Sequence, residues 1–255
     1  MKTASSISIK TSQEIEVLHE GGQILAAITE ELTRSFKQGI TTREIDRMAE
    51  KLIRDNAVLP AFKGYRGFPG CVCTSVNEEV VHGIPGERRL KDGDIVSLDV
   101  GIIHKDYYVD TAVTVGIGKI TPEIEKLLDV TERSLYQGIE QARPGNHLSD
   151  ISHAVQVFVE ANGFSVVRDF VGHGIGRNLH EDPEIPNFGP AHEGPVLKEG
   201  MVLAIEPMVN RGGWQTKVLA DGWTVVTQDG RPSAHFEHTI AVTAEYPRIL
   251  TQRHG

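Results

Sequence analysis

The sequence predicts an α+β fold in which helices cover one face of a central antiparallel β-sheet. Two features support this class: amphipathic helical patterns occur in pairs, and a region rich in β-branched residues follows each pair. The chain has 255 residues, a length that can bury a large core without disulfides. Because no linker of biased composition divides the chain, we expect one domain over residues 1–255, built from two fused halves.

The first helical pair lies near the N-terminus. Thr11 and Glu14 have the spacing of a capping box, as do Thr41 and Glu44, which predicts that one helix starts after each threonine. Apolar residues at helical spacing follow both boxes, and the first pattern ends near Gly39.

A second helical pair follows the first β-rich region. Thr121-Pro122 predicts a helix start, because proline is favoured in the first turn, and Pro144-Gly145 ends that helix. The next helical pattern ends at Asn162-Gly163, and its apolar positions match those of the second helix at a constant offset of 106. The matched positions are Gly39, Ile45, Ala49, Ile53 and Asn56 with Gly145, Ile151, Val155, Val159 and Asn162. This offset predicts an internal repeat, with halves at about 11–118 and 121–250.

Five segments have the composition of β-strands. They are rich in valine, isoleucine and other residues that favour extended backbone. The segments are 95–115, 166–171, 201–209, 222–228 and 236–242.

Composition and charge exclude several classes of protein. With 26 basic and 35 acidic side chains the formal net charge is −9, which argues against a general or sequence-specific nucleic-acid binder. No segment reaches the ~20 apolar residues that cross a bilayer, and residues 1–10 lack the apolar core of a signal peptide. We therefore expect a cytoplasmic protein with no membrane partner, and reduced thiols at Cys71 and Cys73.

Two aspartates lie in the predicted hairpin at 95–115. With a two-residue turn at His104-Lys105, Asp99 would lie directly opposite Asp110, with Cβ atoms roughly 4.5–5.5 Å apart, where like charges are destabilising. A bulge could shift this register, because the turn lacks the Asn-Gly sequence of tight hairpins. The pair alone leaves two explanations open: a cation bound by both carboxylates, or a polar face exposed to solvent.

Three further residues favour the cation. His173 lies at a glycine-rich strand end, while Glu206 and Glu237 each lie inside an apolar run, where a carboxylate is rarely tolerated unless paired or metal-bound. With Asp99 and Asp110 they supply four carboxylates and one imidazole, a set suited to a pair of divalent ions such as Mn, Fe, Co or Zn. Two such ions would balance the four negative charges.

These motifs together resemble those of type I methionine aminopeptidases, which have the pita-bread fold, over the stretch from Ile15 to Leu250. The matching segments are Val81-His82-Gly-Ile-Pro, Asp99, Asp110-Thr111, Gly172-His173-Gly-Ile-Gly, His180-Glu-Asp-Pro, Ile205-Glu206-Pro-Met and Glu237-His-Thr. The resemblance implies two pseudo-symmetric halves and two divalent ions. One ion would be held by Asp110, His173, Glu206 and Glu237, and the other by Asp99, Asp110 and Glu237.

The resemblance also implies roles for residues around the ions. His180 would contact the carbonyl side of the scissile bond, His82 would lie near the leaving amide nitrogen, and Glu206 would shuttle a proton. The methionine side chain would lie near His82 among Tyr65, Phe68, Cys73 and Trp223.

Three positions qualify this picture. Leu179 stands where the family often has an aromatic residue, so the pocket shape departs from the family pattern there. Strand alternation puts His235 on the same side as Glu237, where it could reach the outer shell of the metal site, and turns His238 away, as a structural residue.

The activity implied by the resemblance is removal of the N-terminal methionine from nascent proteins and peptides whose second residue is small. A water molecule made acidic by the metal ions would attack the first peptide bond. The family favours a monomer, and the sequence leaves docking on the ribosome open.

Three alternatives share the fold. Prolidases and proline aminopeptidases share the ligands but usually add an N-terminal domain, and only ten residues precede the first predicted helix. Type II methionine aminopeptidases carry an insertion between the two glutamates, which here lie 31 positions apart (206 and 237). A metal-free binding protein or creatinase-like hydrolase would have lost ligands, and all five are present.

Overall fold

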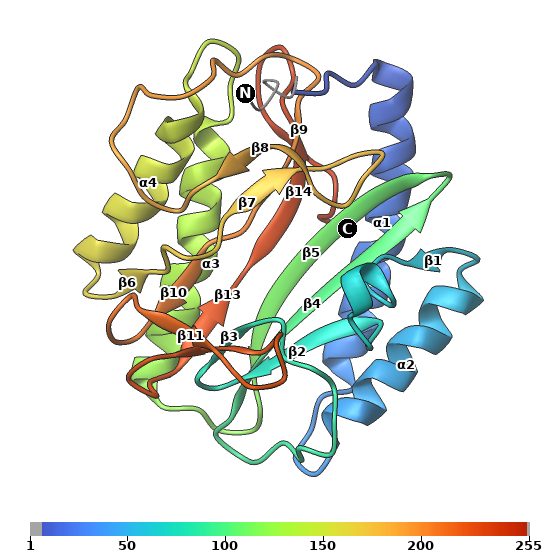
Figure 1. Cartoon of the computed structure of the whole chain (residues 1–255), viewed down its shortest axis with the longest axis vertical. Coiled ribbons are helices and arrows are strands. Elements are labelled where there is room, and N and C mark those ends of the chain that lie inside the picture. The colour runs from blue at the N-terminus through green and yellow to red at the C-terminus, as the bar shows by residue number, and fades with distance from the viewer. Residues whose placement is uncertain (1–6, 254–255) are drawn as a thin grey trace.

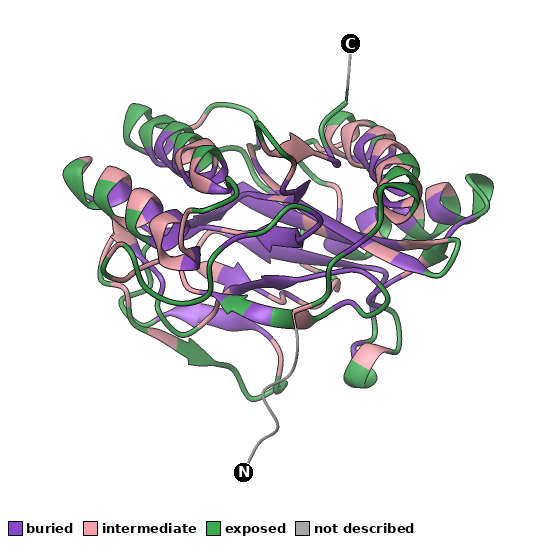
Figure 2. Cartoon of the chain, turned by 90° about the horizontal axis from the view of Figure 1, so that it is seen from above, coloured by how far each residue is buried: buried purple, intermediate pink, exposed green. Residues whose placement is uncertain are grey.

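The computed structural model describes residues 7–253 and confirms the α+β class. A nine-stranded sheet, the largest sheet in the described part of the chain, runs through the centre of the molecule. Four α-helices lie on one face of that sheet and leave the other face to short hairpins and loops (Figures 1 and 2). Among the described residues, no helix is long and apolar enough to cross a membrane.

The helices begin where the sequence predicts. Thr11, Thr41 and Thr121 are the N-caps of the first three, and Thr11 and Thr41 complete capping boxes with Glu14 and Glu44. The helices are α1 Ser12–Arg34, α2 Thr42–Asp55, α3 Pro122–Gln141 and α4 Leu148–Ala161. Helices α2 and α4 have 14 residues each and begin 106 positions apart, at 42 and 148, which matches the offset of the sequence pattern.

Seven strands form the path of the large sheet in the order β1-β4-β5-β14-β9-β7-β8, and every pairing in it is antiparallel. Strand β2 also pairs with β4, and β15 pairs with β14. These strands are β1 Leu59–Pro60, β2 Val72–Val76, β4 Ile95–His104, β5 Tyr107–Gly116, β7 Gly172–Gly174, β8 Glu181–Ile185, β9 Val202–Ile205, β14 Glu237–Ala241 and β15 Arg248–Ile249. Smaller sheets and a 3-10 turn are made by η1 Tyr65–Gly67, β3 Glu79–Val81, β6 Ser165–Val166, β10 Met208–Asn210, β11 Thr216–Val218, β12 Val225–Thr227 and β13 Ser233–His235.

The predicted strand regions are present but shorter. Segment 201–209 is two strands, β9 and β10, broken at Glu206-Pro207. Segment 166–171 is extended only as far as Val166, where β6 ends, and its remainder is loop. The β2 strand was not predicted, although its five residues are all buried.

The predicted register of the β4–β5 hairpin is wrong by two positions. Asp99 lies opposite Ala112 rather than Asp110, and Asp110 lies opposite Gly101. The turn is at Lys105-Asp106, one residue later than predicted, and both residues have positive φ (48° and 65°). A two-residue turn of type I′ needs positive φ at both positions, and aspartate tolerates it better than most residues.

Each helix pair packs on its own part of the sheet. The largest cluster of buried apolar residues joins α1 and α2 to β2, β4 and β5, with Leu25 and Leu98 fully buried in it. Separate clusters lie under α3 and α4. The helix face of the sheet therefore carries most of the core, and its other face is free to carry polar groups (Figure 2).

We expect Leu98→Ala to lower the free energy of unfolding by about 2–5 kcal/mol, the usual cost of a cavity in a packed core. Leu98 is fully buried on β4, whereas Leu59 is 63% exposed. Urea unfolding of both variants measures the difference, and Leu59→Ala should change the free energy by less than about 0.5 kcal/mol. A loss at Leu98 no larger than that at Leu59 would contradict the packing described here.

Candidate active site and metal centre

One row of side chains crosses four neighbouring strands on the face away from the helices. Cys73 on β2 lies opposite Asp99 on β4, which lies opposite Ala112 on β5, which lies opposite Glu237 on β14. Directly opposed residues of antiparallel strands point to the same face. The pairing register therefore brings Asp99 and Glu237 together over a small alanine.

Asp110 joins this row from two residues before Ala112, a spacing that keeps it on the same face. Its strand partner is Gly101, where an added Cβ would lie 2.7 Å from the Phe62 ring. Glycine at this position leaves room for that ring beside the carboxylate. The backbone of Asp110 is held in place by a hydrogen bond, because its N–H donates to the Thr239 hydroxyl at 3.0 Å.

His173 and Glu206 approach from the other half of the sheet. His173 lies opposite Ala204 of β9, and Glu206 follows the same strand two residues later, so both project to the carboxylate face. The distance from His173 Nε2 to Glu206 Oε1 is 3.6 Å. His173 Nδ1 lies 2.9 Å from the carbonyl oxygen of Gly174. A carbonyl can only accept, so Nδ1 carries the proton and Nε2 presents its lone pair to the carboxylates.

The geometry of these groups fits a divalent cation. Ligand atoms of Asp110, His173 and Glu237 lie within 4.8 Å of one another, and all three residues are buried. Asp99 Oδ1 and Glu237 Oε1 are buried with no hydrogen-bond partner among the described residues. Buried carboxylate oxygens without donors are costly unless a cation compensates them. Carboxylate oxygens with one imidazole nitrogen form a donor set typical of divalent metals.

Burial raises the pKa values of all four carboxyl groups, and repulsion between carboxylates raises those of Asp110, Glu206 and Glu237 further. Burial raises the pKa of Asp99 to about 7 from its ordinary 3.8. Burial and the charges of Glu237 and Asp99 hold the pKa of Asp110 well above its ordinary value. The pKa of Glu206 is raised by burial and by Asp99 and Asp110, and that of Glu237 by burial and by Glu206 and Asp99. A divalent cation at this place would favour the ionised forms.

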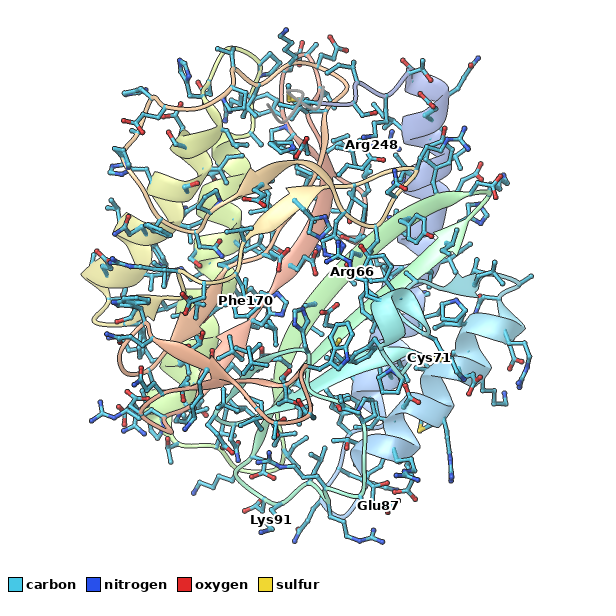
Figure 3. All side chains as sticks on the ribbon, in the orientation of Figure 1. Arg66, Cys71, Glu87, Lys91, Phe170 and Arg248 are labelled. Carbon is cyan, nitrogen blue, oxygen red and sulfur yellow. The ribbon has the colours of Figure 1, made fainter. Side chains whose placement is uncertain are left out.

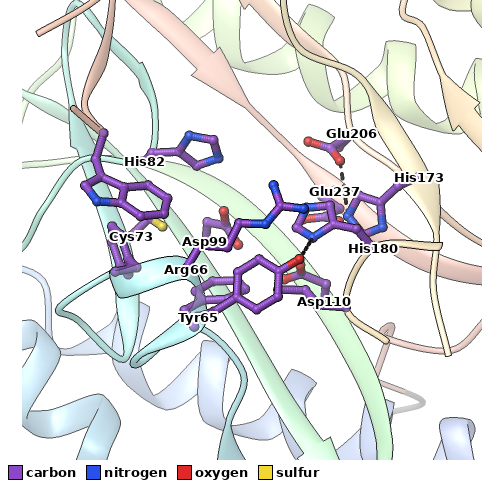
Figure 4. A pocket seen from close by; sticks show the side chains of 14 residues that line it. Tyr65, Arg66, Cys73, His82, Asp99, Asp110, His173, His180, Glu206 and Glu237 are labelled. Carbon is purple, nitrogen blue, oxygen red and sulfur yellow. Dashed lines mark hydrogen bonds and ion pairs between the residues drawn. The ribbon is translucent and has the colours of Figure 1, made fainter. Parts of the chain in front are cut away.

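The structure brings every predicted site residue to one cavity of about 130 Å³ (Figure 4). The residues of the sequence prediction that line it are Tyr65, Phe68, Cys73, His82, Asp99, Asp110, His173, His180, Glu206, Trp223 and Glu237. Leu179 also lines it and is 3% exposed, so an aliphatic side chain occupies the position that departs from the family pattern.

Aromatic rings form the end of the cavity away from Glu206. The Phe68 and Trp223 rings meet edge to face with centroids 5.2 Å apart, and His82 lies 6.2 Å from Trp223. Burial, together with the charges of Asp99, Asp110 and Glu237, holds the pKa of Cys73 well above its ordinary value. The Cys73 thiol is therefore protonated, which agrees with its predicted place in the wall and argues against a nucleophile.

His180 lies at the opposite end of the cavity, next to the cluster of carboxylates and His173. Its ring centroid lies 4.3 Å from that of His173, and its Nδ1 lies 2.9 Å from the Tyr65 hydroxyl. Burial, with smaller contributions from His173 and Arg66, lowers the pKa of His180 to about 3. The imidazole is neutral, so with Nδ1 accepting from Tyr65 its Nε2–H is available as a donor towards a substrate carbonyl.

The two histidines around Glu237 point in different directions. His235 Nε2 lies 3.8 Å from Glu206 Oε2, so His235 reaches the surroundings of the carboxylate cluster. His238 lies on the helix face, where its Nδ1 is 2.9 Å from the Thr251 hydroxyl. There it lines a separate cavity between α1 and α3.

Sequence reasoning missed Phe62 and Arg66, which also line the cavity. Arg66 has φ 49°, a left-handed conformation that is uncommon for a residue with a side chain, between Gly64 and Gly67 at φ 85° and 90°. Figure 3 shows Arg66 over the central strands, and in Figure 4 its side chain reaches across the cavity towards His180. In the sequence, only the two glycines that flank Tyr65-Arg66 indicate an unusual turn at this position.

Comparison with known proteins identifies the class of this site. Residues 16–244 match the model of metallopeptidase family M24. The match covers most of the chain, and the chain therefore belongs to metallopeptidase family M24.

Within this family, full-length relatives are methionine aminopeptidases. The chain is 55% identical over 246 residues to methionine aminopeptidase 1 of Bacillus subtilis strain 168, covering 96% of this chain and 99% of the relative. The crystal structure of methionine aminopeptidase from Thermotoga maritima has a TM-score of 0.95 at 46% identity, with 97% and 100% of the two chains covered. The prolidase of Pyrococcus horikoshii OT3 shares the fold, with a TM-score of 0.79 at 21% identity, but this chain covers 64% of its length. The pita-bread fold and the family predicted from the motifs are confirmed.

The raised pKa of Asp99 predicts that, in metal-free protein, Asp99→Asn increases the free energy of unfolding by an amount that grows with pH. A carboxyl group whose pKa is raised by folding stabilises the folded state below its unfolded pKa, and this contribution is lost as pH rises towards the folded pKa. For Asp99 that window runs from 3.8 to about 7. We therefore compare the free energy of unfolding of Asp99→Asn with that of the unsubstituted protein. The difference in favour of Asp99→Asn should grow by at least about 1 kcal/mol between pH 5 and pH 7, which is roughly the free energy of one pKa unit on one group.

Urea unfolding in chelator measures this difference, and the buried histidines common to both proteins cancel from it. At pH 7, added Mn²⁺ should make the unsubstituted protein more stable than Asp99→Asn, because the unsubstituted protein keeps a carboxylate that a metal can bind. A difference that does not change with pH would show that folding does not raise the pKa of Asp99.

Proposed function

We propose that this protein is a type I methionine aminopeptidase, which removes the N-terminal methionine from peptides and nascent chains whose second residue is small. One observation carries the proposal: the carboxylate and imidazole cluster lies at one end of a cavity whose other end is apolar and closed by aromatic rings. A free α-amino group and an apolar side chain belong to the same residue only at a chain terminus, so this arrangement suits an exopeptidase. Relatives that share this length and fold bear that name.

We propose that two divalent ions bind here, held as the sequence predicts. Asp110, His173, Glu206 and Glu237 would hold one, and Asp99 with Asp110 and Glu237 the other. The donor set accepts Mn, Fe, Co or Zn. When bound, such ions act as Lewis acids and make water a nucleophile at neutral pH.

The residues of this chain would then move protons and orient the peptide. Glu206 is the proposed proton shuttle, taking a proton from the attacking water and passing it to the leaving amine. Its carboxylate lies within 4 Å of both His173 and His235. His180 would donate its Nε2–H to the oxygen of the scissile carbonyl, where negative charge develops. His82, whose ring meets those of Phe170 and Trp223 edge to face, would lie near the leaving nitrogen.

The walls of the cavity support the choice of methionine. Phe68, Cys73 and Trp223 offer an apolar surface that suits a flexible thioether, and sulfur–aromatic contacts are favourable.

A prolidase-like peptidase of the same fold is the second candidate, because it would use the same ligands. Sequence identity favours the first, since the chain is 55% identical to methionine aminopeptidase 1 of Bacillus subtilis and 21% identical to the prolidase. We further propose that residues 1–255 act as a single catalytic domain of two related halves, and as a monomer.

Three peptides separate these functions. We expect cleavage of Met-Ala-Ser and no measurable cleavage of Met-Leu-Ser or Ala-Pro-Ser when metal-free protein is reloaded with Mn²⁺, Fe²⁺ or Co²⁺. Release of the first amino acid is followed by chromatography, and chelator should abolish it. Preferential cleavage of Ala-Pro-Ser would contradict the proposal and support the prolidase alternative.

The shuttle role of Glu206 predicts a specific defect. Glu206→Gln should lower kcat on Met-Ala-Ser by about 10²–10⁴-fold, the contribution typical of a general acid–base, with the fold retained. Glu132→Gln is the control, because Glu132 also has a raised pKa but is exposed and belongs to α3, on the helix face. Metal content is measured alongside turnover. Near-normal kcat in Glu206→Gln would remove Glu206 from the mechanism.

A further inference from the structure

The loop between His173 and His180 must hold two active-site histidines at a fixed separation. It leaves β7 after Gly174 and returns to the sheet at Glu181, the first residue of β8. Gly174 and Glu181 are paired across the two strands, with an irregular register between His173 and Gly174. What holds the intervening residues therefore decides where the His180 ring lies.

A lysine from the N-terminal segment reaches this loop. Lys10 Nζ donates to Glu181 Oε2 at 2.6 Å, across 171 positions of sequence. The two side chains are 4% and 11% exposed. Most other ion pairs of the described residues lie at the surface, where they contribute little, whereas this one is withdrawn from water.

Two glycines leave the space that Lys10 occupies. A Cβ on Gly176 would lie 2.5 Å from Lys10 Cε, and a Cβ on Gly200 would lie 2.7 Å from the Lys10 carbonyl oxygen. The Gly200 carbonyl accepts the Lys10 backbone N–H at 2.7 Å. Both the backbone and the side chain of Lys10 are thus held in a close-fitting site.

The carboxylate of Glu181 passes this restraint to the loop. While Oε2 binds Lys10, Oε1 accepts the backbone N–H of Asn178 at 3.1 Å. The Asn178 carbonyl oxygen in turn accepts a hydrogen bond from the Gly176 N–H at 3.1 Å. The turn that contains Leu179 and His180 is therefore held by the Glu181 carboxylate, which is itself held by Lys10.

The start of α1 supports the same loop from its other side. The Tyr107 hydroxyl donates to Glu14 at 2.5 Å, and the Arg177 guanidinium lies 4.0 Å from the centre of the Tyr107 ring. The next residue, Tyr108, donates its N–H to the Gly176 carbonyl at 2.8 Å. Lys10 thus contacts the histidine loop directly, and Glu14 is linked to that loop through Tyr107.

We propose that Lys10 is a positioning residue for His180, and that the buried Lys10–Glu181 ion pair sets the place of the His180 imidazole in the active site. This inference rests on the proposed function only for its kinetic test. Without Lys10, the Glu181 carboxylate would be buried and unpaired, would turn towards water, and would release the Asn178 N–H. The His180 ring would then be less well placed against the substrate carbonyl, while the metal ligands on the strands would be unchanged.

The first test is Lys10→Met, which keeps an unbranched side chain and removes the charge. We expect kcat on Met-Ala-Ser to fall at least tenfold, with KM within twofold and bound metal unchanged. Lys51→Met is the matched control: Lys51 also makes a 2.6 Å ion pair, with Asp55, but its side chain is 67% exposed on α2. Turnover of Lys10→Met equal to that of Lys51→Met would overturn the proposal.

A double-mutant cycle separates positioning from a general structural effect. If Lys10 acts through His180, Lys10→Met should lower the residual kcat of His180→Ala by less than twofold, because the group being positioned is already gone. An equal fold-change in both backgrounds would overturn the proposal. Should Lys10→Met fail to fold, Glu181→Gln breaks the same ion pair and enters the same cycle with the same expected outcomes.

A measurement on metal-free protein is independent of catalysis. In spectra of protein labelled with ¹³C-histidine, with the His180 ring signal assigned by its loss in His180→Ala, that signal should shift or broaden in Lys10→Met and stay in place in Lys51→Met. An unchanged His180 signal would overturn the proposal. A protein that shows the expected shift but cleaves no Met-Ala-Ser would instead overturn only the proposed function.

Discussion

The structure depends on one electrostatic constraint: four carboxyl groups, two of them buried and two half-buried, lie together on one face of one sheet. Burial raises the pKa of all four, and neighbouring carboxylates raise the pKa values of Asp110, Glu206 and Glu237 further. Two of the carboxylate oxygens have no donor among the described residues. Such a cluster is stable in ionised form only with compensating positive charge, and no lysine or arginine among residues 7–253 forms an ion pair with it. Divalent cations supply that charge in a small volume, which is why the family assignment and the electrostatics agree.

The sheet achieves this clustering through its register and through small residues. Asp99 and Glu237 flank Ala112 from two sides, and Asp110 lies opposite Gly101, so bulky side chains do not separate the carboxylates. The helices occupy the opposite face, where the apolar residues of the same strands are buried. Because successive side chains of β4 and β5 point to opposite faces, one face carries the apolar core and the other carries the carboxylates. A shift of one residue in either strand would exchange the two faces.

The same geometry explains which predictions from sequence succeed. Helix starts at Thr11, Thr41 and Thr121 depend on neighbours three residues away, so they can be read locally. The predicted hairpin turn was one residue early, which moved the partner of Asp99 by two positions and left it on the correct face. The wrong register therefore still leaves Asp99 and Asp110 on one face, whereas their grouping with His173, Glu206 and Glu237 rests on the sequence motifs. Arg66 was missed because its position follows from a left-handed turn rather than from residue type, and nothing local to Lys10 indicates a partner 171 positions away.

The two kinds of site residue differ in how they are held. Asp99, Asp110 and Glu237 are strand residues, fixed by the ladder that also holds the core together, so their geometry follows from folding itself. His180 lies outside the strands, in a turn whose closure depends on one carboxylate. A catalytic donor must be held to within a fraction of an ångström of its productive place, and a loop gives less precision than a strand. A buried ion pair from a distant segment supplies the missing restraint at small cost in space, provided that glycines make room for it. On this argument Lys10 and the start of α1 belong to the active site as much as the strands do, although they do not line its cavity.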